Sequence, residues 1–328
     1  MSRTVLRLIP FLLAAVVSSA QPAVENPPPK QGRIHGVLAG NSRVAKVKGG
    51  FQQLEGPVTI HGWGLYFSDI DQNRTYKVDQ NETISVWREN TNAANGLFLM
   101  NDGRLLAAER GNSDPPSPGR IVAVLRNRSV TVIASQFHSK PFHGPHDLIA
   151  DSRGGIYFTD PGPAIPPNLA PGDRRGDVYY IRPDGDILLV DDQMVYPNGI
   201  TLSLDEKTLF VDDTFGEYVY AFDVQPDGQV NNKREFVKLQ EPERWPPWGL
   251  RSRAEGMAID SKDRLYVATA AGVQVIDPQG EYLGTIRVPE TVRNLAFSGT
   301  WRQILYMTAP TSLYRIWLLS QGPAKRAK

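Results

Sequence analysis

Six similar segments recur along this chain of 328 residues, and each carries one polar residue at the same place. Each segment is a short apolar run followed by a turn and a second apolar run, as in LEGPVTI (54–60) and GLYFSD (64–69). Repeats 39 to 57 residues apart are typical of the blades of a β-propeller, in which four-stranded units surround a central channel lined by their first strands. The residues at the shared position are Glu55, Asn95, His146, Asn198, Glu255 and Asn294.

The ends of the repeat region indicate how the ring closes. The last repeat lacks a fourth strand after SLYRIWLL (312–319), whereas the strand-like segment RVAKVKG (43–49) precedes the first repeat. We therefore predict an all-β, six-bladed propeller over residues 42–319, closed by an N-terminal strand in the last blade, which removes open sheet edges. Residues 21–41 are predicted to be a flexible leader and residues 320–328 a disordered basic tail.

Residues 1–20 have the features of a secretory signal peptide. Two arginines precede an apolar run over residues 8–17, and small residues occupy positions 18–20. The chain has no cysteine, which excludes disulfides, a thiol nucleophile and a lipid-modified N-terminal cysteine. The expected location is therefore secreted or periplasmic, without membrane association after cleavage. The net charge of +1 gives no indication of a nucleic-acid partner.

Two insertions are expected on the face where the shared polar residues lie. They cover residues 161–173 and 240–253 and are rich in proline. Insertions on one face of a repeat fold often mark the binding face. Trp245 and Trp248 are then candidates for an apolar lining, although the insertions can also be read as tolerated surface loops.

The ring of polar residues predicts a cation site. Glu55 and Glu255 are expected to face each other, no Lys or Arg occupies the ring, and two buried carboxylates do not both stay ionised without a counter-charge. Carboxylate and amide oxygens suit a hard divalent ion; the alternative is a channel that holds only water. Acids at the ends of the second strands are expected either to accept hydrogen bonds from the ring or to form an acidic rim: Asp69, Glu109, Asp160 and Asp213.

The repeats together resemble the regucalcin/gluconolactonase family. The resemblance rests on LEGP, ANGLFLMNDGRLL, GPHDLIADSRGGIYFTDP, YPNGITLSLDEKTLFVDDT, AEGMAIDSKDRLYVA and RNLAFSG, and it covers residues 43–318. It implies a six-bladed propeller that holds one divalent cation and hydrolyses sugar lactones or related cyclic esters.

The resemblance also implies site residues. Glu55 and Asn198 match metal ligands of the family, and Glu255 stands where the family has an aspartate. His146 stands where the family commonly has an asparagine, which contacts metal or substrate, and Arg110 replaces a common histidine. The expected ion is Ca²⁺, or Zn²⁺ or Mn²⁺ if His146 is a ligand.

The leading hypothesis is a metal-dependent hydrolase of a small lactone. The expected metal ligands are Glu55, Asn198, Glu255 and His146, and the candidate general bases are Glu255, Asp213 and His146. The expected substrate contacts are Asn95, Arg110 and Trp248. The alternative hypothesis is a non-catalytic propeller that binds a ligand or a protein and uses its channel ion structurally.

Overall fold

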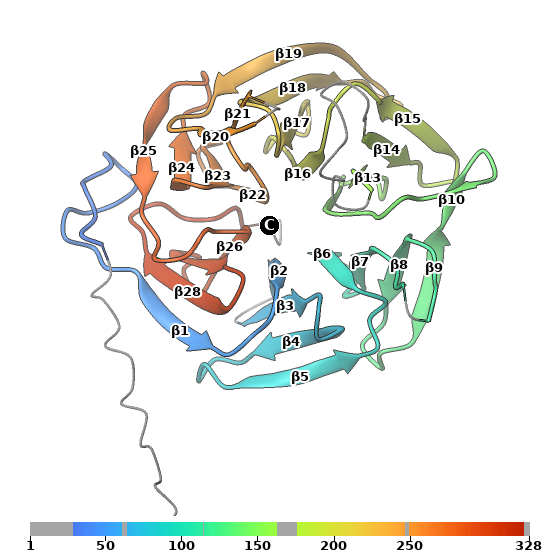
Figure 1. The fold of residues 1–328 in the computed structure, drawn as a ribbon, viewed down its shortest axis with the longest axis horizontal. Helices are drawn as coiled ribbons and strands as arrows, with labels where there is room; N and C mark the ends of the chain where they lie inside the picture. Colours follow the sequence, from blue (N-terminus) through green and yellow to red (C-terminus); the bar gives the residue numbers. More distant parts are fainter. Residues whose placement is uncertain (1–28, 61–63, 114, 163–175, 247–248, 325–328) are drawn as a thin grey trace, which may run out of the picture.

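The computed structural model describes residues 29–60, 64–113, 115–162, 176–246 and 249–324, which form strands and turns. Six four-stranded antiparallel sheets surround a central channel, as Figure 1 shows. This arrangement confirms the predicted six-bladed propeller. None of the described residues form a helix with the length and apolarity needed to cross a membrane.

Each blade is numbered from its inner strand outward. Blade one contains β2 (Leu54–Thr59), β3 (Leu65–Asp69), β4 (Arg74–Val78) and β5 (Ile84–Glu89). Blade two contains β6 (Ala94–Leu99), β7 (Leu105–Glu109), β8 (Arg120–Val124) and β9 (Val130–Ala134). Blade three contains β12 (Leu148–Ala150), β13 (Ile156–Asp160), β14 (Asp177–Ile181) and β15 (Ile187–Asp191).

The remaining blades follow the same order. Blade four contains β16 (Pro197–Leu202), β17 (Thr208–Asp213), β18 (Tyr218–Val224) and β19 (Val230–Lys238). Blade five contains β22 (Met257–Ile259), β23 (Leu265–Thr269), β24 (Gly272–Ile276) and β25 (Tyr282–Ile286). Blade six contains β26 (Asn294–Ser298), β27 (Ile304–Thr308), β28 (Ser312–Trp317) and β1 (Ala45–Gly49). Two small hairpins join β10 (Gln136–Phe137) to β11 (Lys140–Pro141) and β20 (Glu243–Trp245) to β21 (Gly249–Arg251).

The N-terminal strand closes the ring as predicted. β1 pairs antiparallel with β28, from Ala45 opposite Arg315 to Gly49 opposite Ser312. The seam between blades six and one is apolar, and Phe67 of β3 and Tyr306 of β27 belong to one buried cluster there. Burial of each such large side chain contributes about 1.5–3 kcal/mol, so the seam is held by packing as well as by backbone hydrogen bonds.

The segments that precede and follow the propeller in the sequence are more ordered than expected. We expected a flexible leader over residues 21–41, but Val37 and Leu38 are fully buried against blades five and six. In the expected C-terminal tail, Ser320 accepts or donates a hydrogen bond at 2.8 Å with the Tyr266 hydroxyl, and Pro323 is buried. Apolar side chains therefore hold the first segment in place, and a hydroxyl holds the second. The composition of both segments had predicted flexibility. The predicted signal peptide lies outside the described residues, so export stays a prediction.

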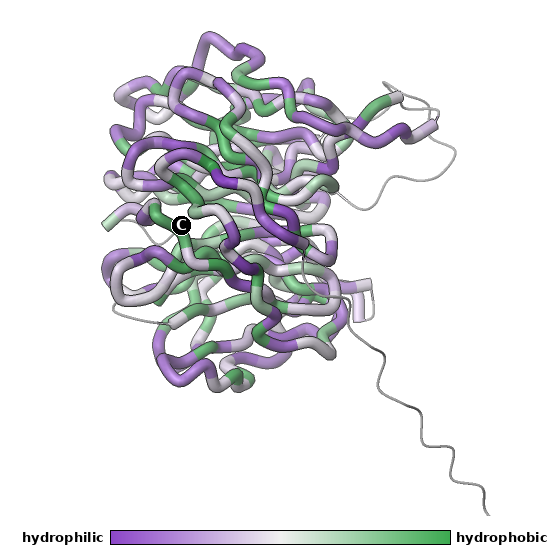
Figure 2. Tube along the Cα trace, turned by 90° about the vertical axis from the view of Figure 1, so that its left-hand side faces the viewer, coloured by the Kyte–Doolittle hydropathy of each residue, from purple (hydrophilic) through white to green (hydrophobic). Residues whose placement is uncertain are grey.

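The disc, seen edge-on in Figure 2, has two faces that carry different strand ends and loops. The shared polar residues lie at or just before the starts of the inner strands, so connectors into the blades and loops after the second strands share their face. The turns between first and second strands lie on the opposite face, where Pro323 lies beside those of blades two to four. We call the first of these the ring face.

Candidate metal centre in the channel

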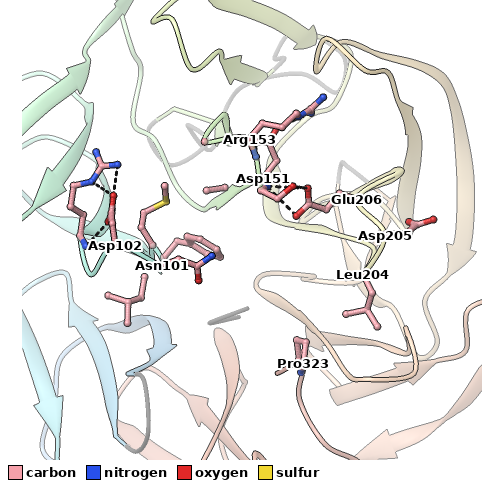
Figure 3. Close-up of a pocket in the computed structure, with 15 residues that line it drawn as sticks. Asn101, Asp102, Asp151, Arg153, Leu204, Asp205, Glu206 and Pro323 are labelled. Carbon is pink, nitrogen blue, oxygen red and sulfur yellow. Dashed lines mark hydrogen bonds and ion pairs between the residues drawn. The ribbon is translucent and has the colours of Figure 1, made fainter. Parts of the chain in front are cut away.

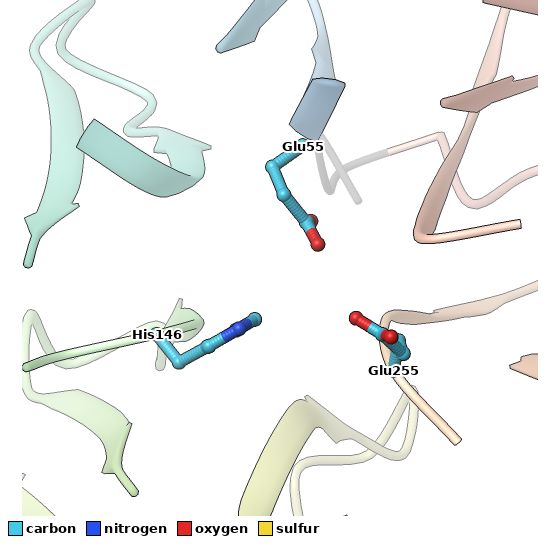
Figure 4. Close-up of side chains that lie close together, drawn as sticks. All are labelled: Glu55, His146 and Glu255. Atoms are coloured by element: carbon cyan, nitrogen blue, oxygen red, sulfur yellow. The ribbon is translucent and has the colours of Figure 1, made fainter. Parts of the chain in front are cut away.

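Two carboxylates and one imidazole converge at the ring-face end of the channel. Glu55 comes from β2, and His146 and Glu255 precede β12 and β22 by two residues. One ligand atom from each lies within 4.8 Å of the others, and Figure 4 shows the three side chains pointing toward one another. All three are buried, with exposed fractions of 5% or less. Convergence of two carboxylates and an imidazole in a buried site is suited to a divalent cation.

Asn198 completes a donor set that fits such an ion. Its Nδ2 donates to Thr214 Oγ1 at 2.9 Å and lies 3.5 Å from Glu255 Oε2. Its Oδ1 is buried and has no hydrogen-bond partner within the described part of the chain. A buried carbonyl oxygen left in this state is costly unless a ligand or water satisfies it. The structure thus brings together the four predicted ligands Glu55, His146, Asn198 and Glu255.

The electrostatics of the site also favour a bound cation. Burial raises the pKa of Glu55 to about 8, and the neighbouring Glu255 acts in the same direction. Burial also raises the pKa of Glu255, while Arg293 opposes this shift. Carboxyl groups with raised pKa values are short of positive charge, and a divalent ion would supply it.

Arg293 corrects the expectation that no cationic residue serves the ring. Its Nη1 donates to Glu255 Oε1 in an ion pair, and its side chain is 24% exposed. Arg293 immediately precedes the ring residue Asn294, and its long side chain reaches into the channel mouth from there. One carboxylate of the facing pair therefore has a protein counter-charge before any metal binds.

Two further acids near the ring were missed. Asp147 Oδ2 accepts a hydrogen bond from Asn294 Nδ2 at 3.3 Å, across the channel from its own blade. Burial raises the pKa of Asp212 well above its ordinary value, although its Oδ1 accepts a bond from the Gly199 backbone. The sequence does mark Asp147 as unusual. Glycine follows the ring residue in four of the six repeats, whereas Asp147 stands at that position in the third repeat.

Those glycines are needed because neighbouring inner strands approach very closely. A Cβ atom at Gly199 would lie 2.0 Å from Glu255 O, and one at Gly256 would lie 2.0 Å from Asn294 Cγ. These separations are far below van der Waals contact, so any side chain would push apart the strands that carry the ligands. Gly199 and Gly256, which follow Asn198 and Glu255, thus allow the inner strands to lie close together.

The acids that end the second strands have structural rather than channel contacts. Asp213 accepts hydrogen bonds from the backbone amides of Val195, Tyr196 and Phe215, at 2.9–3.1 Å. Asp69 and Asp160 accept equivalent bonds from the connectors into their own blades. Glu109 instead pairs with two arginines, Arg88 and Arg120. Asp213, a candidate general base, thus lies at a connector and binds its backbone amides.

The buried Asp160 carboxylate gives a testable pH dependence. Burial raises its pKa from an ordinary 3.8 to about 6, so the folded state holds its proton more tightly than the unfolded state does. Its stabilising contribution is therefore present below pH 4 and is lost as pH rises through 6. Relative to Asp160→Asn, which cannot titrate, the natural protein should lose about 2 kcal/mol of unfolding free energy between pH 4 and pH 7. Urea unfolding of both proteins at each pH measures this, and a constant difference would contradict it.

The predicted substrate contacts occupy different places. Asn95 is fully buried, and neither polar atom of its amide has a partner among the residues that the structure describes. Arg110 lines a cavity of about 720 Å³ on the ring face, beside blades one to three. Trp248 and most of the 161–173 insertion lie outside the described residues. The 240–253 insertion contributes the β20–β21 hairpin, which includes Trp245.

A second cavity lies on the opposite face, away from the ligands. It has a volume of about 640 Å³ and is lined by turns of blades two to four and by Pro323. Charged side chains of this cavity form ion pairs: Arg104 with Asp102, which is bonded in Figure 3, and Arg153 with Asp151. Glu206 likewise accepts bonds from the backbone and hydroxyl of Ser152. This cavity therefore offers mutually satisfied groups rather than a convergent ligand set.

The fold and its channel define a six-bladed propeller with a candidate metal centre at one mouth. The sequence profile described as the SMP-30/Gluconolactonase/LRE-like region matches residues 54–311. The chain belongs to this family, which confirms the resemblance noted from its repeats.

Individual relatives agree with this assignment. A gluconolactonase from Zymomonas mobilis subsp. mobilis is 27% identical over 309 residues, which cover 87% of this chain and 83% of that protein. The structure of a gluconolactonase from Xanthomonas campestris is 26% identical, with a TM-score of 0.73 over 90% of this chain and 96% of that one. A calcium-binding regucalcin from Agrobacterium tumefaciens shares the fold, at 14% identity and a TM-score of 0.68 over 85% of this chain and 94% of that one.

Proposed function

We propose that this protein is a metal-dependent hydrolase of a small lactone or related cyclic ester. The observation that carries the proposal is the buried convergence of Glu55, His146 and Glu255, joined by the unsatisfied Oδ1 of Asn198. Relatives that are named gluconolactonases and span most of the chain support the same reaction class.

The four convergent residues would hold the cation, and the chemistry it supplies is Lewis-acid polarisation of the lactone carbonyl. Asn198 is oriented for this task, because its Nδ2 donates to Thr214 and its Oδ1 is left to bind the metal. Thr214 in turn donates to Ala254 O at 2.7 Å, so one hydroxyl links Asn198 to the backbone beside Glu255. The ligands are thus held by neighbouring blades rather than by mobile loops.

Proton transfer is assigned to Glu255 or His146. Arg293 occupies Glu255 Oε1, which leaves Oε2 to accept a proton from the attacking water. Asp213 is less suited, since its carboxylate already accepts three backbone bonds. The buried amide of Asn95 is available to hydrogen-bond the substrate's ring oxygen or the leaving alkoxide.

The proposal is tested with purified protein, a panel of lactones and a chelator. Turnover should disappear after chelation and return when a divalent cation is added. Asn198→Ala should lower kcat/KM by about 10²-fold, because it removes a ligand, while the protein stays folded. Asn101→Ala, in a turn on the opposite face, is the matched control and should retain turnover. Chelator-resistant turnover would contradict metal dependence, and absent turnover with metal-dependent melting would indicate the non-catalytic alternative.

The position of His146 makes a prediction about the identity of the metal. Its imidazole lies with the two carboxylates, and nitrogen ligands favour Zn²⁺ or Mn²⁺ over Ca²⁺. Since even outer-shell partners are worth 10–100-fold in metal affinity, His146→Asn should lower Zn²⁺ affinity by at least about tenfold and spare Ca²⁺ affinity. Titration calorimetry with each ion compares the two proteins. An unchanged preference would show that His146 is not a ligand.

A further inference from the structure

A row of aromatic side chains runs from the candidate metal centre to the β20–β21 hairpin. We call Tyr196, Phe215 and Trp245 the aromatic wall. The rings of His146 and Tyr196 are 6.1 Å apart, those of Tyr196 and Phe215 are 5.3 Å apart, and Phe215 stacks on Trp245 at 4.5 Å. Each member therefore contacts the next, and the row begins at a predicted ligand.

The wall is held firmly in place on the ring face. The backbone amides of Ser252 and Arg253, after the hairpin, donate to the carbonyls of Gly216 and Thr214, at 2.8 and 3.2 Å. Arg251 lies 4.1 Å from the Trp245 ring centroid, and its Nε donates to Glu243 Oε1 at 2.7 Å. Figure 1 shows β20 and β21 beside blades four and five, inside the outer strands. Aromatic rings that are fixed in this way offer binding area at little entropic cost.

Exposure along the wall suits contact with a substrate. Tyr196 is buried, whereas Phe215 and Trp245 are half-buried and keep surface toward solvent. The mouth is chemically asymmetric, because the side formed by blades one to three carries the cavity lined by Arg110, Asn112 and His143. A substrate whose lactone ring reaches the ligands would thus have the aromatic wall, with Arg251 over Phe215 and Trp245, on one side and the cavity with Arg110 on the other.

We propose that the aromatic wall receives a flat apolar substituent, and that the preferred substrate is an aryl-substituted lactone rather than a polyhydroxylated one. This inference rests on the proposed lactone hydrolysis and adds the substrate class. An aryl group gains from burial and from offset or edge contacts with fixed rings. The hydroxyls of a sugar lactone would instead lose water against ring faces that offer few hydrogen-bond partners.

The test compares a matched pair of substrates, γ-phenyl-γ-butyrolactone and γ-butyrolactone, which differ only by the phenyl group. The ratio of their kcat/KM values should be on the order of 10–100 in the natural protein, the usual worth of one apolar group in a pocket. Phe215→Ala and Trp245→Ala should each bring the ratio close to one. Phe215→Leu, which keeps an apolar side chain, should give an intermediate ratio and guards against misfolding of the alanine variants. Trp301→Ala, which removes a 69% exposed tryptophan on the opposite face, should leave the ratio unchanged.

A binding measurement separates failure of the inference from failure of the proposed function. Calorimetry with 5-phenylpyrrolidin-2-one and pyrrolidin-2-one, the corresponding lactams, needs no turnover. Tighter binding of the phenyl lactam that is lost in Trp245→Ala supports the wall even if no lactone is hydrolysed. The inference about the aromatic wall is overturned if both lactones are hydrolysed at similar rates and the wall variants do not change the ratio. That outcome leaves the proposed lactone hydrolysis standing. Equal or absent binding of the two lactams also overturns it, as does faster turnover of D-glucono-δ-lactone that the wall variants leave intact.

Discussion

Glu255→Gln is expected to abolish both metal binding and turnover, lowering kcat/KM by on the order of 10³-fold or more. The substitution keeps the size of the side chain but removes the charge that faces Glu55 and pairs with Arg293. It also removes the proposed acceptor of the water proton at Oε2. Steady-state kinetics and metal titration on the same preparation measure the two losses together.

A second buried carboxylate controls for the general effect of removing charge. Glu109 of blade two is fully buried and pairs with Arg88 of blade one and with Arg120 of its own blade. Glu109→Gln should destabilise the fold but retain metal binding, because its contacts lie outside the channel. If Glu255→Gln kept its metal affinity, the assignment of Glu255 as a ligand would fail.

Arg293→Gln is expected to destabilise the metal-free protein and to strengthen metal binding. Without the guanidinium, two buried carboxylates face each other uncompensated, which should cost roughly 3 kcal/mol of unfolding free energy. The metal should then bind roughly tenfold more tightly, since it no longer shares Glu255 with a competing cation. Thermal unfolding with chelator and with saturating metal, together with calorimetry, gives both quantities.

Arg264 provides the matched control for this change. Its guanidinium also pairs with a buried acid, Asp260, at 2.7 Å, but at a turn on the opposite face. Arg264→Gln should lower the melting temperature equally with and without metal. A similar metal-independent loss in Arg293→Gln would mean that Arg293 supports the fold and does not compete with the ion.

The architecture and the ligand ring could be predicted from the sequence because both depend on period and position. An alternating strand places each residue on a known side, so Glu55 and Asn198 could be assigned to the channel from their place in the repeat. The closing role of β1 followed from counting strands, since blade six lacked one. These features are set by the backbone, and the backbone follows the apolar pattern closely.

Features that depend on side-chain reach were not predictable in this way. Arg293 occupies a position next to the ring, and only its extended side chain brings its charge onto Glu255. Asp213 was expected near the chemistry, yet its short side chain turns to the connector amides of its own blade. Leu38 was assigned to a flexible leader because a short apolar segment has no period from which to predict its packing. In each case the deciding contact is tertiary and leaves no repeat in the sequence.

The pairing of β1 with β28 has a consequence for the order in which the molecule is made. Among the described strands β1 is translated first and its partner β28 last, so the ring stays open until β28 has been made. Until then β1 has no partner strand, and an unpaired strand edge is the part of a sheet most prone to join another chain. A contact between strands so distant along the chain also forms slowly. A nascent chain therefore has to keep β1 available until β28 has been made, and deletion of either strand would leave the other without its partner.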